Sequence, residues 1–232
     1  MKWILAGAML LALVTPGCQG RSDRTRGLRD DLPLYADYQV WGEEHSDSIT
    51  MLFQFHEGYP SGPARELADP ARIDLDGRSP VLGSARLTGA YYELRLPADS
   101  FEGKHVITLT LAAGKAFRDT FSFASLRLTQ EIPDTIRRTD LKLDLAGLDQ
   151  GDILQVVATD TSFRSRDINQ SDTIGQLPLR LTREQLGNLV SGPVSLELYR
   201  EKNQILGSGD RVSRYLAQYY VIRRQVFLVG TP

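Results

Sequence analysis

Three histidines offer the most varied chemistry in this sequence, because an imidazole can bind a metal or move a proton. His45 lies in the acidic segment 42–47, and His56 begins a loop rich in glycine and proline. The strand-like segment 48–55 would hold these two side chains roughly 26 Å apart, which is too far for one shared metal ion. His105 has no partner nearby in the sequence. We therefore expect no metal site, and surface or loop positions for His45 and His56.

Nucleophilic catalysis would need a serine or cysteine positioned beside a histidine and a carboxylate. The sequence has no G-x-S-x-G elbow, no P-loop, no G-x-G-x-x-G and no H-E-x-x-H. Cys18 is the only cysteine, and a lipidated cysteine cannot act as a nucleophile. We expect a protein that is not an enzyme and that requires no cofactor.

The segment ATDTSFRSRDINQSDTIGQ (158–176) is the longest stretch without apolar alternation, and we expect it to be irregular. Its aspartate and asparagine oxygens are calcium-type ligands, but their spacing departs from the known calcium loop and arginines lie between them. A polar loop is the simpler interpretation. Long loops at the end of a sandwich often bind partners, so this loop and 56–70 are candidate contact regions. The candidate residues are His56, Tyr59, Phe163, Arg164, Asp167 and Asn169.

Aromatic residues gather in three groups, which allow two interpretations. Exposed aromatic rings could stack on the C–H faces of sugars, whereas aromatic residues in strands usually pack in a core or an interface. Neighbours along a strand must point to opposite faces, so each adjacent pair would divide between core and surface. The groups are Tyr35, Tyr38 and Trp41; Tyr91 and Tyr92; and Tyr215, Tyr219 and Tyr220.

The N-terminus has the pattern of an export signal. Lys2 supplies a positive charge, and WILAGAMLLALV (3–14) is too short to cross about 30 Å of hydrocarbon as a helix. The residues TPG (15–17) and then Cys18 follow. This stretch resembles the lipobox of bacterial lipoproteins. A lipobox usually has Leu three residues before the cysteine and Ala or Ser two residues before it, where this chain has Thr15 and Pro16. The resemblance implies that Cys18 is lipidated and becomes the first mature residue; the alternative is conventional cleavage.

Residues 19–33 (QGRSDRTRGLRDDLP) have no apolar periodicity, which is typical of a flexible tether. Their arginines would gain some attraction to anionic headgroups, or they are simply solvated linker charges. No acidic run follows the cysteine directly, which favours a protein facing the periplasm. The net charge of -2 offers no basic surface for a nucleic acid.

From residue 34 onward the apolar residues recur with a period of two, which predicts an all-β chain. The helical candidate 182–190 is at most a turn or two. Turn signals rich in glycine and proline separate the expected strands. The expected strands are 48–55, 72–77, 91–96, 105–114, 116–123, 141–148, 152–160, 177–181, 194–201 and 219–229.

The two halves of the chain repeat one pattern, in 91–111 and 177–198. Each has an alternating strand, a short helical turn and a second long strand. An apolar residue, Phe101 or Leu186, would close the end of the core at each turn. The residues that bound these turns are Pro97, Asp99 and Gly103 in one half and Thr182, Gln185 and Gly192 in the other. This pattern resembles the E-to-F crossover of immunoglobulin-like and fibronectin-like sandwiches.

The complete layout resembles uncharacterised lipoproteins with Ig-like domains that are common in Bacteroidota. It implies two tandem immunoglobulin- or fibronectin-like β-sandwiches after a signal peptide and a flexible tether. We expect a membrane-anchored, non-catalytic binding or scaffolding protein of the cell envelope with a protein partner. We expect its anchor to lie in the outer membrane, with the protein facing the periplasm. The alternative is a carbohydrate-binding lipoprotein with exposed aromatic residues. The expected boundaries are 1–17 for the signal peptide, 18–33 for Cys18 and the tether, 34–128 for one sandwich and 129–232 for the other.

Overall fold

The computed structural model describes residues 33–162, 166–173, 179–209 and 211–230. Within these residues the chain is almost entirely β-structure, which confirms the expected fold class. The strands of its largest sheet are β1 (Leu34–Glu43), β2 (Ser48–Glu57), β4 (Val81–Ala85), β5 (Gly89–Pro97), β9 (Thr135–Arg137), β12 (Ile153–Asp160), β13 (Ile168–Thr173), β15 (Gly192–Gly207) and β16 (Val212–Val229). Their order is β13-β12-β15-β16-β1-β2-β5-β4, and β9 also pairs with β16. None of the helices in the described residues is long and apolar enough to cross a membrane.

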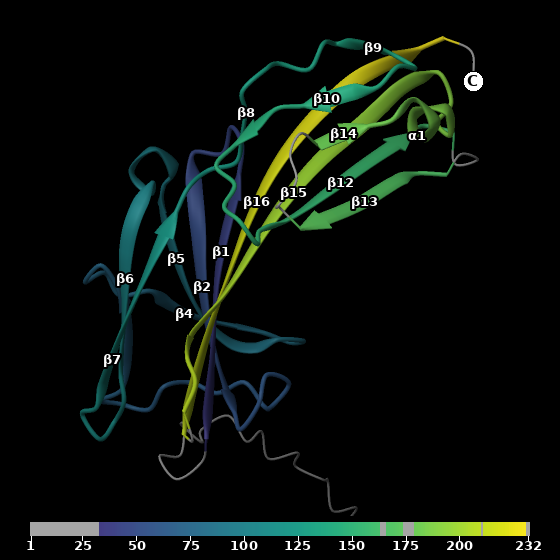
Figure 1. The fold of residues 1–232 in the computed structure, drawn as a ribbon. Helices are drawn as coiled ribbons and strands as arrows, with labels where there is room; N and C mark the ends of the chain where they lie inside the picture. Colours follow the sequence, from purple (N-terminus) through teal and green to yellow (C-terminus); the bar gives the residue numbers. More distant parts are fainter. Residues whose placement is uncertain (1–32, 163–165, 174–178, 210, 231–232) are drawn as a thin grey trace, which may run out of the picture.

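The long hairpin of β15 and β16 belongs to both halves of the molecule (Figure 1). The first part of β16 pairs in parallel with β1, from Leu34 opposite Val212 to Glu43 opposite Val221. On its other side β15 pairs with β12, from Glu201 opposite Ile153 to Val194 opposite Asp160, and the end of β16 pairs with β9. A division of the chain after residue 128 would therefore separate β1 from its partner. The two sandwiches share one continuous sheet.

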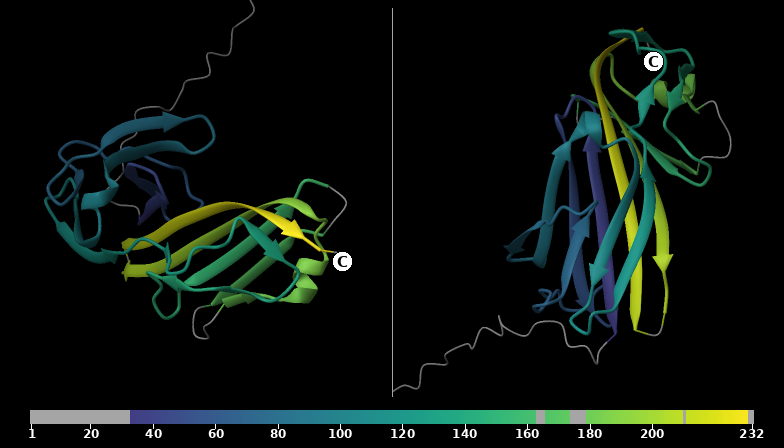
Figure 2. Two further views of the ribbon diagram at one scale, coloured as in Figure 1. Left: turned by 90° about the horizontal axis from the view of Figure 1, so that it is seen from above. Right: turned by 90° about the vertical axis from the view of Figure 1, so that its left-hand side faces the viewer.

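Smaller sheets cover one face of this shared sheet and complete the two sandwiches (Figure 2). One apolar cluster runs through both sandwiches, from Tyr38 and Phe53 to Leu198 and Ile222. The first sandwich is closed by the sheet of β3 (Arg72–Leu75), β6 (Gly103–Thr110) and β7 (Ala116–Phe123). The second contains the paired strands β10 (Leu141–Leu143) with β14 (Leu179–Leu181) and β8 (Arg127–Leu128) with β11 (Leu145–Ala146).

The two expected crossovers between sheets are confirmed. The 3₁₀ helix η1 (Ala98–Ser100) links β5 to β6, and α1 (Arg183–Gly187) links β14 to β15. Phe101 and Leu186 are each buried at these turns. In the second crossover, Thr182 accepts a hydrogen bond from the Gln185 amide, and the Gln185 side chain accepts one from the Thr182 amide. This reciprocal cap satisfies two backbone donors that the first turn of a helix leaves free.

The segment 158–176 is not the irregular loop that its composition suggested. It contains the end of β12 and all of β13, which pair from Ile153 opposite Thr173 to Ala158 opposite Ile168. β13 forms an edge of the sheet, and its side chains alternate between a buried or half-buried face and an exposed face. An edge strand is held by backbone hydrogen bonds on one side, so a mostly polar sequence can form it.

Candidate binding site

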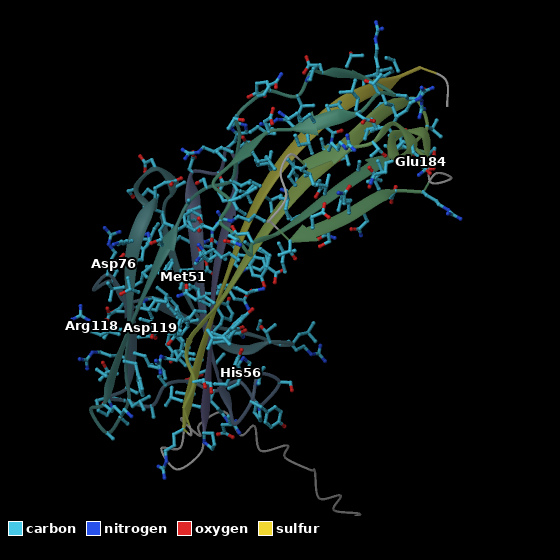
Figure 3. All side chains as sticks on the ribbon, viewed as in Figure 1. Met51, His56, Asp76, Arg118, Asp119 and Glu184 are labelled. Carbon is cyan, nitrogen blue, oxygen red and sulfur yellow. The ribbon has the colours of Figure 1, made fainter. Side chains whose placement is uncertain are left out.

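The residues proposed as loop contacts do not converge. His56 is the penultimate residue of β2, and its Nδ1 lies 2.9 Å from the Gly62 carbonyl oxygen; Tyr59 is exposed in the loop that follows. Figure 3 places His56 in the lower part of the first sandwich. Asp167 is exposed, and Asn169 on β13 accepts a hydrogen bond from Gln155 in the second sandwich. The other candidate positions, Phe163, Arg164 and the lipidation candidate Cys18, lie outside the described residues.

A hollow of about 510 Å³ lies on the open face of the shared sheet, and both halves of the chain contribute to it. This volume is within the range of small-ligand sites. The sheet register places Trp41, Tyr219, Glu201 and Ile153 side by side on four adjacent strands. The lining residues are Trp41, Ile153, Gln155, Ser171, Tyr199, Arg200, Glu201, Tyr219 and Val221.

Trp41 is the most exposed aromatic ring of this hollow, at 43%. Its ring stacks on Tyr219, with 4.2 Å between ring centroids and 22° between ring planes. Its indole N–H donates to Gln39, and the Gln39 amide donates to Asp37 at 2.7 Å. This chain of contacts fixes the orientation of the indole. One face of Trp41 is occupied by Tyr219, so the two rings do not form a flat, coplanar platform.

The tyrosines of the aromatic face have raised pKa values, first through burial and then through nearby carboxylates. Burial raises the pKa of Tyr219, and the carboxylates of Glu201 and Asp37 raise it further. Burial and the same two carboxylates also raise the pKa of Tyr215. For Tyr35 the pKa rises through burial and then through Asp37. Burial and nearby carboxylates both disfavour a negative charge on the phenol oxygen.

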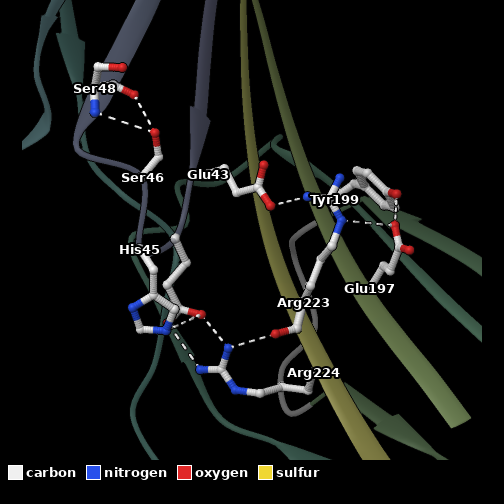
Figure 4. A network of polar contacts seen from close by, with 9 residues as sticks. Glu43, His45, Ser46, Ser48, Glu197, Tyr199, Arg223 and Arg224 are labelled. Carbon is white, nitrogen blue, oxygen red and sulfur yellow. Dashed lines mark hydrogen bonds and ion pairs between the residues drawn. The ribbon is translucent and has the colours of Figure 1, made fainter.

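Arginines neutralise other carboxylates at the edge of this face (Figure 4). Arg224 forms a two-pronged contact with Glu44, in which the Nη2–Oε1 distance is 3.0 Å. Arg223 pairs with Glu43, and its Nε lies 3.6 Å from Glu197. These contacts join the turn after β1 to β16. Glu43 and Glu44, which precede His45, therefore form ion pairs with arginines of β16.

His105 occupies a buried position that its sequence context did not predict. Its Nδ1 lies 2.7 Å from the Asp76 carboxylate, and its Nε2 lies 2.7 Å from the Phe101 carbonyl. The imidazole also stacks on the Phe101 ring at 4.2 Å. These contacts fasten the turn after β3 to the first crossover. Among the residues that the structure describes, no group of three or more His, Cys, Asp or Glu side chains could hold a metal ion.

The aromatic groups divide between core and surface, as alternation along a strand requires. Tyr38 and Tyr220 are buried, whereas Trp41 and Tyr219 lie on the open face. The sequence did not indicate that β15 contributes to the hollow, because Tyr199 has no other aromatic residue near it in the sequence. The alternation in VSLELYRE (194–201) nevertheless carries a usable signal, since it places Glu197, Tyr199 and Glu201 on one face.

Comparisons with known proteins give no family for this chain. No protein-family model matches it, and no curated protein matches its sequence. The solved structure of DIP-gamma IG1+IG2 has 10% sequence identity and a TM-score of 0.22, and the match covers 80% of this chain and 97% of that one. A chimeric titin Z1Z2 carrying a KLER peptide from decorin has 16% identity and a TM-score of 0.19, with coverage of 83% and 94%. These likenesses are weak.

Proposed function

We propose that this protein is a non-catalytic binding module of the cell envelope, and that the hollow beside Trp41 is its binding site. The observation that carries the proposal is the position of an exposed aromatic ring in a hollow built by both halves of the chain. Five strands of one continuous sheet contribute side chains to it. Such a framework holds its contact residues in place before a partner arrives, which lowers the entropy lost on binding.

The proposal includes an anchor at Cys18, by which acyl chains hold the protein on a membrane. It is supported by the apolar run that ends just before the only cysteine. The absence of an acidic run directly after Cys18 favours the periplasmic side of the outer membrane. A Cys18→Ala variant is expected to move from the membrane fraction to the soluble fraction. Retention of this variant in the membrane to the same extent as the parent would contradict the anchor.

A carbohydrate ligand is the second candidate, favoured by the exposed face of Trp41 and by the nearby polar groups of Gln155 and Ser171. Sugar rings stack on aromatic faces while side-chain amides and hydroxyls bind their hydroxyl groups. The stacking of Tyr219 on Trp41 leaves a narrower platform than three coplanar rings would provide. A protein partner therefore remains our first proposal.

Position-specific photo-crosslinking of the full-length protein in the cells that make it tests the proposed binding site. One photoreactive residue replaces Asn203, which is exposed on β15 near Glu201. A matched control replaces Arg118, which is exposed on β7 in the other sheet of the first sandwich (Figure 3). We expect a discrete adduct from position 203 and none from position 118. Identical patterns, or no adduct from position 203, would contradict the proposed site.

A further inference from the structure

The open face of the shared sheet carries a row of aromatic rings bordered by carboxylates, which we call the acidic aromatic strip. Its residues are Tyr35, Asp37, Trp41, Tyr199, Glu201, Tyr215 and Tyr219. The register places Asp37 opposite Tyr215, Trp41 opposite Tyr219, and Tyr219 opposite Glu201. From Tyr35 to Trp41 the strip extends about 20 Å along β1, which is the length of about six residues of extended chain.

The carboxylates of the strip differ from the other carboxylates on this face. Glu43 and Glu197 contact Arg223, and Glu93 pairs with Arg95 at 2.6 Å. Within the described ranges, Asp37 and Glu201 have no lysine or arginine as ion-pair partner; they accept hydrogen bonds from Gln39 and Asn203. Two carboxylates of the strip thus have no cationic partner in the described residues: Glu201 in the hollow with Trp41, and Asp37 four residues away along β1.

The rings of the strip are also without a cation in the part of the chain that the structure describes. Cations elsewhere lie over aromatic faces: Lys115 and Arg214 lie 4.8 and 4.4 Å from the centroid of the Phe117 ring, and Arg200 lies over Phe123. A cation gains energy above an aromatic face, most of all above tryptophan, and gains more when carboxylates lie beside it. Trp41 and Glu201 offer both partners within one hollow.

We propose that the acidic aromatic strip docks a basic, extended segment of a protein partner, with an arginine or lysine side chain above Trp41 and beside Glu201. This inference rests on the proposed function, since it names the partner chemistry of the same site. Charge complementarity selects this occupant over a neutral glycan, because a glycan would leave Asp37 and Glu201 without a cation. It also makes association dependent on salt, since partly exposed charges are screened over about 10 Å at 0.1 M ionic strength.

Tryptophan fluorescence gives a direct readout of the strip. The chain has two tryptophans, Trp3 and Trp41, so a Trp3→Phe background leaves the ring of the strip as the sole reporter. The full-length protein in detergent is titrated with a six-residue peptide that alternates arginine and glycine, with its lysine counterpart, and with its glutamate counterpart. We expect saturable fluorescence changes with the two basic peptides, weaker binding at higher salt, and no change with the acidic peptide.

Matched variants locate the binding. Glu201→Gln preserves the shape of the side chain and is expected to raise the dissociation constant of the arginine peptide about tenfold. Glu93→Gln removes a charge from the same sheet face outside the strip, and it should leave the dissociation constant unchanged. Equal weakening by both variants, or no saturable binding of either basic peptide, would overturn the inference.

Neutral oligosaccharides distinguish failure of this inference from failure of the proposed function. Saturable binding of maltotetraose or chitotetraose at Trp41, unaffected by salt and by Glu201→Gln, would overturn the basic-segment proposal and support a carbohydrate-binding module. Failure of every peptide and oligosaccharide, with a discrete crosslink from position 203, would overturn only the basic-segment proposal. The absence of that crosslink as well would overturn both.

Discussion

The shared hairpin of β15 and β16 predicts that the two sandwiches unfold together. Leu198 on β15 is buried in the core of the second sandwich, whereas Leu216 on β16 pairs with Tyr38 in the first. Replacement of either leucine by alanine removes buried methyl groups and leaves a cavity, at a cost of about 2–5 kcal/mol. For a chain of this size, 3 kcal/mol corresponds to a decrease in Tm of roughly 6–12 °C.

The assay combines two signals with different locations. Far-ultraviolet circular dichroism reports the strands of both sandwiches, and Trp41 fluorescence in the Trp3→Phe background reports the end of β1, where the first sandwich meets the shared hairpin. We expect Leu198→Ala to lower the midpoint of both signals equally, although Trp41 lies on β1, which belongs to the first sandwich. Coincident transitions are the mark of a single cooperative unit.

A control variant and a refuting result complete this test. Ile205→Ala alters the same hairpin at a position that is 74% exposed, so stability should change by no more than about 0.5 kcal/mol. If Leu198→Ala lowered the circular-dichroism midpoint and left the Trp41 midpoint unchanged, the sandwiches would be independent. The argument from the continuous sheet would then be wrong.

Three further predictions concern the stability of the sandwiches, measured by urea unfolding. Asp119→Asn breaks a buried ion pair with Arg214 at 2.7 Å and should cost about 3–5 kcal/mol, with partial rescue by adding Arg214→Met. Tyr38 has a buried hydroxyl with no hydrogen-bond partner among the described residues, and burial raises the pKa of this phenol. Tyr38→Phe should therefore stabilise the protein by about 1 kcal/mol. It should also reduce the stability lost as pH rises above about 10, because the unfolded phenol ionises there and the buried one does not. Thr182→Ala removes a helix cap and should cost about 1 kcal/mol, whereas Thr182→Ser should not.

Local features of the fold were predictable because their causes are local. The pattern of Thr182 and Gln185 specifies a capping box within four residues, and the apolar residue that follows is the one buried at the crossover. Alternation likewise identified β7 as Ala116–Phe123. These predictions needed only propensity, capping and the side-chain period of a strand.

Long-range pairing could not be predicted, because alternation shows which face a side chain occupies but not which strand lies beside it. Nothing in the first half of the sequence indicates that β1 pairs with β16, since the pairing depends on the fold of the whole chain. The acidic aromatic strip depends on this pairing. Trp41 and Tyr219 both stand out in the sequence as aromatic residues, but only the register of these two strands makes them one stack.

The parallel pairing of β1 and β16 also has a mechanical consequence. The chain enters β1 at Leu34, whose amide donates to the Arg211 carbonyl where β16 begins, and it leaves β16 at Val229. β16 extends about 60 Å, so its two ends lie far apart. A pull between the entry to β1 and the exit from β16 would load these strands in opposite directions along their length. Their hydrogen bonds would then share the load in shear, so they would resist together instead of opening one after another.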